Sequence, residues 1–144
     1  MNVRAALTDE LDAVAQLWWG SFQSTGLALP GDDDIRALRQ RLDRGLAEGW
    51  RLFLAVDGDV ILGMLVLAGD TLSQLFIAAD RQGQGIGTRL FEHACAELPE
   101  GFTLKTRVAN RAARRFYEAR GMRLDRVGPD SDGDPRPSAW YRWP

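Results

Sequence analysis

A glycine-rich segment that opens a helix carries the most informative chemistry in this chain. Residues Gln82 to Thr88 read Gln-Gly-Gln-Gly-Ile-Gly-Thr and follow an apolar run, Thr71–Ala78. Glycine lets a main chain approach a ligand closely, and the first amides of a helix have no acceptor inside it. Those amides, together with the positive end of the helix dipole, make a binding site for an anion, above all for phosphate.

Two familiar phosphate-binding loops do not fit this segment. A nucleoside-triphosphate loop requires Lys followed by Ser or Thr after its last glycine, whereas Gly87 is followed by Thr88 and Arg89. A dinucleotide-binding loop that started at Gly83 would require Gly or Ala where Leu90 stands. The segment therefore indicates a different phosphate ligand.

A second motif lies downstream of the glycine loop. The loop has the form Gln82-x-x-Gly85-x-Gly87, and the later segment is Asn110-x-x-Ala113-x-x-Phe116-Tyr117-Glu118-x-x-Gly121-Met122. Together they resemble the GNAT superfamily of N-acetyltransferases, whose motifs are Gln/Arg-x-x-Gly-x-Gly/Ala and Asn-x-x-Ala-x-x-Phe-Tyr-Glu-x-x-Gly-Phe. The resemblance covers about Thr71 to Leu124, and Met122 departs from the usual aromatic residue.

The resemblance implies that acetyl-coenzyme A (acetyl-CoA) is the cosubstrate. In this family the strand before the loop pairs with the pantetheine arm through backbone groups, and the loop amides hold the pyrophosphate. Residues in the positions of Asn110 and Tyr117 lie near the cofactor and near its sulfur. The implied catalytic residue is Tyr117, and the implied cofactor-binding residues are Leu75, Phe76, Ile77, Gln82, Gly83, Gln84, Gly85, Ile86, Gly87, Thr88 and Asn110.

The proton that the acceptor amine must lose has no assigned base in this sequence. An amine attacks a thioester only when neutral, yet a lysine-type amine titrates near ~10.4. Many relatives carry a carboxylate on the strand before the loop, whereas this chain has Thr71, Ser73 and Gln74 there. A water relayed through polar groups is the expected route. Tyr117 would protonate the departing thiolate with modest benefit, because a thiol of pKa about 8.5 leaves readily.

The elements that position these residues follow from the apolar periodicity. Thr8 is expected to cap the first helix, Asp32 to Asp34 to open the second, and Asn110 to cap the last. The resemblance implies an α/β (α+β) fold with a GNAT-like mixed, mostly antiparallel twisted sheet of about seven strands. Helices would cover both faces, and a parallel splayed strand pair would form the cofactor site. Strands are expected at 3–7, 50–56, 60–68, 71–78, 102–108, 122–127 and 136–143.

Other reactive side chains have simpler structural explanations. His93 is expected to be solvated or half-buried, and Cys95 to pack as a small apolar residue. They stand two positions apart on one helix, so they do not face each other. A solvated helix face, or else the adenosine phosphate of the cofactor, accounts for Arg111, Arg114 and Arg115.

The acidic and aromatic residues in and before the first two helices each have a structural and a functional interpretation. Asp32 to Asp34 satisfy a helix N-terminus, or they form an acidic rim that attracts a cationic amine. Trp18 and Phe22 fit the buried stripe of the first helix, whereas Trp19 lies off that stripe and is a candidate for lining the acceptor pocket.

Composition sets the remaining limits. The 144 residues are 45% hydrophobic and 26% charged, which predicts one globular domain. The resemblance implies that this is a single acetyltransferase domain over residues 1–144. The net charge of −2 gives no electrostatic case for nucleic acid or an anionic membrane as partner. A single cysteine forms no internal disulfide, and no grouping has metal-ligand spacing. We expect a cytoplasmic protein, and the aromatic terminal strand makes a homodimer reasonable.

The sequence thus predicts an N-acetyltransferase in which a primary amine attacks acetyl-CoA directly in a ternary complex. The acceptor is a small-molecule or peptide amine whose identity the motifs do not specify. The alternative is a non-catalytic module that binds or senses acyl-CoA. The missing carboxylate favours that alternative, and Tyr117 favours the enzyme.

Overall fold

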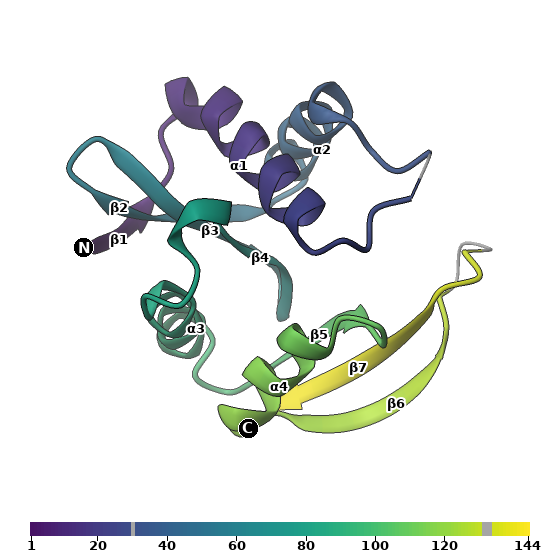
Figure 1. Cartoon of the computed structure of the whole chain (residues 1–144). Coiled ribbons are helices and arrows are strands. Elements are labelled where there is room, and N and C mark those ends of the chain that lie inside the picture. Colours follow the sequence, from purple (N-terminus) through teal and green to yellow (C-terminus); the bar gives the residue numbers. More distant parts are fainter. Residues whose placement is uncertain (30, 131–133) are drawn as a thin grey trace. The chain divides into compact units, whose positions relative to one another are not determined.

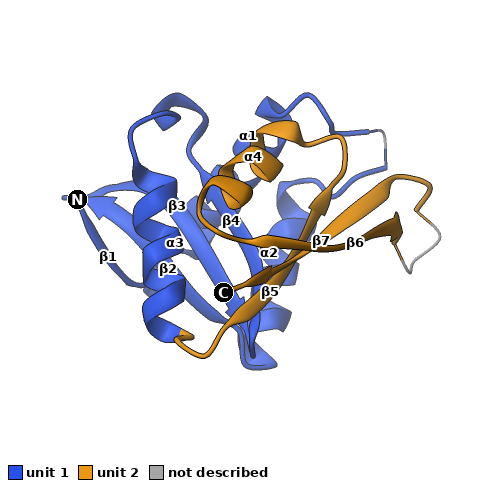
Figure 2. Cartoon of the chain, turned by 90° about the horizontal axis from the view of Figure 1, so that it is seen from below, with its two compact units in different colours: residues 1–97 blue, residues 98–144 orange. Residues whose placement is uncertain are grey.

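Seven strands and four α-helices make up the described part of this computed structural model, which covers residues 1–29, 31–130 and 134–144. The chain divides into two units, residues 1–97 and 98–144, which Figure 2 colours separately. The first unit contains β1 (Asn2–Ala5), α1 (Leu11–Ser24), α2 (Ile35–Ala47), β2 (Arg51–Asp57), β3 (Val60–Ala68), β4 (Thr71–Ile77) and α3 (Ile86–Glu97). The second contains β5 (Phe102–Arg107), α4 (Arg111–Ala119), β6 (Arg123–Pro129) and β7 (Pro137–Trp143).

The four strands of the first unit pair antiparallel in the order β1-β2-β3-β4. Helices α1 and α2 cover one face of these strands and α3 covers the other (Figure 1). Alternate residues of β2 and β3, among them Leu54 and Met64, are fully buried against Val14, Trp18 and Leu42 of the two helices. Period-two alternation along a strand places such residues on one face, so this core fixes α1 and α2 over the sheet.

A glycine sets the position of α3 on the opposite face. A Cβ at Gly63 of β3 would lie 3.0 Å from the Leu90 side chain of α3 and 3.1 Å from that of Ile77. A larger residue here would push these neighbours aside by a few tenths of an ångström, so glycine allows the close approach. The start of α3 is thereby held near the end of β4.

The second unit is a three-stranded antiparallel sheet in the order β5-β7-β6, with α4 on one face. Leu104, Tyr141 and Leu124 form one cross-strand row on the α4 side. Phe102 and Trp143 pair beyond that row, with ring centroids 5.3 Å apart. Tyr141 is 1% exposed and is the largest fully buried side chain of the unit.

The architecture confirms the mixed α/β fold with seven mostly antiparallel strands that the sequence predicted. The expected cap of the first helix is wrong. Thr8 begins a 3-10 turn, Thr8–Glu10, and α1 starts at Leu11. The Glu10 carboxylate accepts a hydrogen bond from the Leu7 amide at 2.8 Å and is paired with Arg4 at 2.8 Å. The ion pair with Arg4 holds the Glu10 carboxylate beside the Leu7 amide, just before the helix, where the sequence predicted Thr8 as the cap.

Two smaller differences concern aromatic packing and chain ends. Trp18 is buried as expected, but Trp19, which the sequence placed off the stripe, also packs partly against the same core. Strand β1 ends at Ala5 rather than at residue 7, and β6 continues to Pro129. None of the helices formed by the described residues has the length and apolar character that crossing a bilayer demands.

Candidate functional site

The glycine loop after β4 adopts a backbone that only glycine favours. Gly83 has φ +76° and Gly85 has φ +80°, both in the left-handed region. A Cβ built on either glycine meets no atom within 4 Å. The glycines are therefore required by backbone conformation rather than by crowding, and the space beside both Cα atoms is open.

The loop leads directly into the first turn of α3. The earliest helical bond runs from the Arg89 amide to the Gly85 carbonyl at 3.2 Å. The amides of residues 86–88 precede that bond, so the helix itself offers them no acceptor. Ile86 is buried and anchors the turn, whereas Gly83 and Gly85 are exposed. This combination of an anchored helix end and an accessible main chain suits an anion.

Gln82, a predicted cofactor-binding residue, braces the loop. Its side-chain Nε2 donates a hydrogen bond to the Ile77 carbonyl at 3.0 Å. The bond joins the start of the loop to the last residue of β4. Gln82 thus holds the loop amides in place relative to the strand, and any contact of its own with a ligand would be additional.

The last residues of β4 are only half-buried, although they are large and apolar. Phe76 lies on the α1 face, with its ring 6.2 Å from that of Trp18, and Ile77 lies on the α3 face. Leu75 is half-buried as well. Their partial exposure leaves an apolar strand end beside the glycine loop. The polar residues earlier in β4 are Thr71, Ser73 and Gln74, so the strand carries no carboxylate.

In the second unit, Asn110 caps α4 as predicted. Its Oδ1 accepts a hydrogen bond from the Ala113 amide at 3.1 Å. The cap satisfies one of the free donors at the start of the helix. Because the Asn110 oxygen already serves this helix, any role toward a cofactor falls to its amide nitrogen or to the neighbouring backbone.

Tyr117, the predicted catalytic residue, is 7% exposed and lies on the inner face of α4. Its ring contacts Phe116 at 5.3 Å between centroids and Tyr141 of β7 at 6.5 Å. Burial raises the pKa of the Tyr117 phenol well above its ordinary value. The phenol therefore stays protonated throughout the neutral and mildly alkaline range and is not available as a base.

Sequence reasoning missed the partner that holds α4 in place. The Tyr141 hydroxyl donates a hydrogen bond to the Glu118 carboxylate and accepts one from Arg114 Nε at 2.9 Å. The spacing of Arg114, Tyr117 and Glu118 was the available signal, since positions i, i+3 and i+4 share one helix face. The expected solvated face holds for the exposed Arg111 and is wrong for Arg114, which is half-buried.

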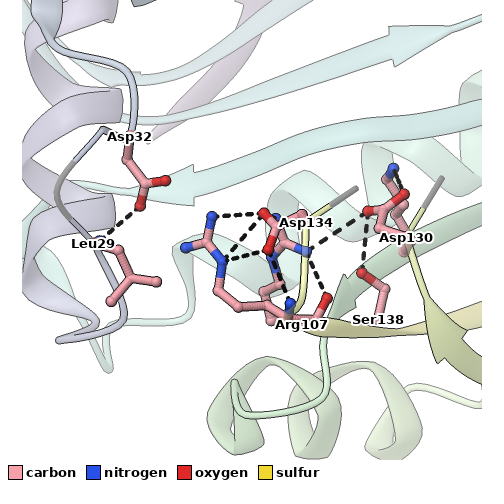
Figure 3. A network of polar contacts seen from close by, with 8 residues as sticks. Leu29, Asp32, Arg107, Asp130, Asp134 and Ser138 are labelled. Atoms are coloured by element: carbon pink, nitrogen blue, oxygen red, sulfur yellow. Dashed lines mark hydrogen bonds and ion pairs between the residues drawn. The ribbon is translucent and has the colours of Figure 1, made fainter. Parts of the chain in front are cut away.

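An ion-pair network joins β5 to the start of β7 and the residues just before it (Figure 3). Asp134 accepts from Arg107 at 2.8 Å and from Arg136 at 2.7 Å. Asp130 accepts from Ser138 at 3.2 Å and pairs with Lys105 at 3.0 Å. Hydrogen bonding to Arg136 holds the pKa of Asp134 far below its ordinary range, with Arg107 adding to the effect. The Asp134 carboxylate therefore stays ionised, and both carboxylates are engaged within the protein.

The three aspartates before α2 also have protein partners. Asp34 caps α2 by accepting from the Ala37 amide at 2.8 Å, and Asp32 accepts from the Leu29 amide at 2.8 Å (Figure 3). Asp33 pairs with Arg41 at 3.2 Å. The helix-terminus explanation therefore accounts for Asp34 directly. Asp32 and Asp34 accept from neutral amides and keep their negative charge, so the acidic rim stays a hypothesis.

His93 and Cys95 lie apart, as expected. The His93 ring is half-buried, 4.5 Å from the ring of Phe53, and its Nε2 is 3.4 Å from Glu97. Cys95 is half-buried, and burial raises the pKa of its thiol, which disfavours the nucleophilic thiolate. Across residues 1–29, 31–130 and 134–144, no group of three or more His, Cys, Asp or Glu side chains could hold a metal ion.

Comparison with known proteins places these features in a common context. Residues 11–122 match the family model described as Acetyltransferase (GNAT) family. The chain is 32% identical to the peptidyl-lysine N-acetyltransferase YjaB of Salmonella typhimurium strain LT2 over 139 residues, covering 95% of this chain and 94% of that protein. It is similar in structure to apo YjaB from Escherichia coli, with a TM-score of 0.80, 26% identity and coverage of 98% and 95% of the two chains.

A second structure shares the fold at low identity. It is yncA from Salmonella typhimurium with its cofactor acetyl-CoA, at a TM-score of 0.75, 14% identity and coverage of 99% of this chain and 92% of that one. The matched range 11–122 contains both the glycine loop and the Asn110–Met122 motif. The two sequence motifs and the fold of the whole chain therefore both indicate the GNAT family.

Proposed function

Because the chain belongs to the GNAT family of acetyltransferases, we propose that it transfers an acetyl group from acetyl-CoA to a primary amine by direct attack in a ternary complex. The observation that carries this proposal is the glycine loop. Gly83 and Gly85 hold positive φ angles between the half-exposed end of β4 and the first turn of α3. That arrangement presents main-chain donors to a diphosphate.

The proposed binding residues act mainly through their backbone. The amides of Gly83 to Thr88 hold the pyrophosphate, and Leu75 to Ile77 receive the pantetheine arm along β4. Gln82 supports both regions, because its bond to the Ile77 carbonyl ties the loop to the strand. Acetyl-CoA supplies an activated thioester. The binding of such a ligand by main-chain atoms tolerates many side chains but few changes at the glycines.

Tyr117 is the proposed acid toward the departing thiolate. Its burial keeps the phenol protonated, which is the state an acid needs before the reaction. β4 offers Thr71, Ser73 and Gln74, none of which is a base at neutral pH. We therefore assign the deprotonation of the amine to water relayed through polar groups.

The proposed acceptor is the side chain of a lysine in a protein. This choice rests on the 32% identical relative that is named as a peptidyl-lysine N-acetyltransferase. The same proposal includes one domain spanning both units, a cytoplasmic location and a homodimer. It includes no nucleic-acid or membrane partner, which the net charge of −2 supports.

Release of free thiol with a panel of amines tests the proposed function. We expect release of coenzyme A above background hydrolysis with lysine-containing peptides whose N-termini are blocked, together with a mass increase of one acetyl group on the lysine. Binding of acetyl-CoA without any amine-dependent release would instead support the non-catalytic module. No binding of coenzyme A at millimolar concentration would overturn both functions.

A further inference from the structure

The face of the second unit that is turned away from α4 is rich in exposed cations. Strand register aligns Thr103, Arg142 and Arg123 in one cross-strand row, and Lys105, Trp140 and Arg126 in the next. Directly paired residues of neighbouring strands point to the same side of a sheet. Because Tyr141 points toward α4, its neighbours Trp140 and Arg142 point to the opposite side. We call these six residues the cationic face.

The charges of this face are only partly neutralised within the protein. Lys105 pairs with Asp130 at 3.0 Å, and Arg123 donates to the Pro144 carbonyl at 2.9 Å. In the described ranges of the chain, no carboxylate lies within ion-pair distance of Arg126 or Arg142, both of which are exposed. The two arginines therefore present uncompensated positive charge to solvent.

An aromatic ring organises the centre of the face. The Arg126 guanidinium lies 3.6 Å from the centroid of the half-buried Trp140 ring. Stacking on an indole restricts the arginine and leaves its edge N–H groups free to meet a carboxylate. A pre-positioned guanidinium loses less entropy on binding than a freely moving one, so this arginine is suited to recognition.

Charge is distributed unevenly between the two units. Residues 98–144 contain ten basic and six acidic side chains, whereas residues 1–97 contain eight basic and fourteen acidic ones. The whole chain has a net charge of −2, which gives no electrostatic case for a long polyanion such as nucleic acid, whereas the second unit by itself is basic. The charge balance thus favours a peptide over nucleic acid.

We propose that the cationic face docks an acidic, extended segment flanking the acetylated lysine of a protein acceptor. This inference rests on the proposed lysine acetyltransferase function and names its substrate class. Successive rows of the face are two residues apart on β7, about 7 Å along the strand. An extended peptide places alternate side chains at the same interval, so acidic residues at every second position match the two rows.

Three short peptides with one lysine each and blocked N-termini test the proposal. Their flanking residues alternate with Glu, Gln or Arg and are otherwise the same. We expect kcat/KM for the Glu peptide to exceed that for the Arg peptide by about tenfold at low salt, from a few exposed charge pairs. The ratio should shrink toward unity at about 300 mM salt, because exposed charges are then screened. Equal kcat/KM for the three peptides would overturn the docking proposal.

Charge reversal on the face provides the matched comparison. The double variant Arg126→Glu/Arg142→Glu should lower kcat/KM for the Glu peptide about tenfold, raise it for the Arg peptide and leave the Gln peptide within about twofold. The control Arg36→Glu/Arg44→Glu makes the same net change at two exposed α2 positions and should keep the original ranking. If charge reversal prevents folding, Arg126→Gln/Arg142→Gln should abolish the preference without inverting it.

The outcomes separate the two proposals. If the Gln peptide is acetylated but flanking charge has no effect, the docking proposal fails and the acetyltransferase function stands. If no peptide and no small amine releases thiol, the proposed function itself fails. If a short single-stranded oligonucleotide competes with the Glu peptide at lower concentration than a free Glu-rich peptide does, the face binds nucleic acid and the assignment is wrong.

Discussion

The glycine loop before α3 and the motif on α4 contribute different groups to the candidate site, one mainly backbone and the other mainly side chains. The loop depends on main-chain conformation, with Gly83 and Gly85 at positive φ and open space beside them. The α4 motif depends on side chains: Asn110 caps the helix, Tyr117 is buried, and Glu118 binds Tyr141 of β7. The loop exposes its main chain because its glycines have no side chains, whereas α4 packs its side chains closely.

This difference predicts how each region responds to substitution. A loop that binds through its main chain should be sensitive to backbone strain and indifferent to side-chain polarity. A packed helix face should divide its residues into those that affect turnover and those that affect only stability. Pairs of matched variants distinguish these behaviours.

The largest effect is expected from Gly85→Val. A β-branched residue is strained at φ +80° and should displace the loop amides. Since a shift of about 1 Å can cost about 100-fold, KM for acetyl-CoA should rise by about 100-fold in steady-state assays. Gly69→Val is the control, because Gly69 also has positive φ (+59°) and open space but lies between β3 and β4. An equal rise in KM for both variants would mean that strain, not the loop, matters.

Tyr117→Phe should lower kcat by on the order of 10²-fold or less and leave KM for acetyl-CoA nearly unchanged. Because burial raises the pKa of Tyr117, ionisation of this phenol should cause no loss of wild-type kcat up to pH 10. The pH profile of kcat under conditions where chemistry limits turnover provides the measurement. An unchanged kcat in that regime would remove Tyr117 from the reaction.

Tyr141→Phe is the matched tyrosine variant. It keeps the ring but removes the hydroxyl that contacts Arg114 and Glu118. Leaving a charged partner without its hydrogen bond should reduce the free energy of unfolding by about 1–3 kcal/mol in urea titrations. We expect kcat to stay within about threefold of wild type. A larger kcat loss than that of Tyr117→Phe would reverse the proposed roles of the two tyrosines.

Two helix caps sharpen the comparison further. Asn110→Ala and Asp34→Ala each remove a side chain that accepts from a first-turn amide, so each should reduce the free energy of unfolding by about 1 kcal/mol. Only Asn110→Ala should also raise KM for acetyl-CoA. If the two variants behave alike in that assay, Asn110 is a cap and nothing more.

The smallest effect concerns the ion pair before α1. Hydrogen bonding to Arg4 lowers the pKa of Glu10 to about 2 in the folded chain. A carboxylate with a lowered pKa stabilises the fold above its ordinary pKa of about 4.5 and loses that contribution as pH falls toward 2. Glu10→Gln should therefore lower Tm at pH 7, with a loss of at most about 1 kcal/mol in the free energy of unfolding. This difference from wild type should disappear near pH 2. The exposed Glu100→Gln should show no such convergence.

Local sequence was sufficient where the physical signal is local. The two glycines of the loop and the Asn110 cap each act on residues within four positions, so residue types and spacing located the loop and predicted the cap correctly. The apolar patterns indicated where the strands and helices lie, and the family resemblance implied the mixed fold of about seven strands. The family followed from the two motifs together, and the match over residues 11–122 confirmed it.

Tertiary structure decided the contacts between residues far apart in the chain. Arg114 left the predicted solvated face because Tyr141, 27 positions away, accepts its hydrogen bond. Such contacts depend on which distant segments the fold brings together, and the spacing of residues along the sequence does not specify this. The cationic face belongs to the same class, because strand register alone brings Lys105, Arg126 and Trp140 into one row.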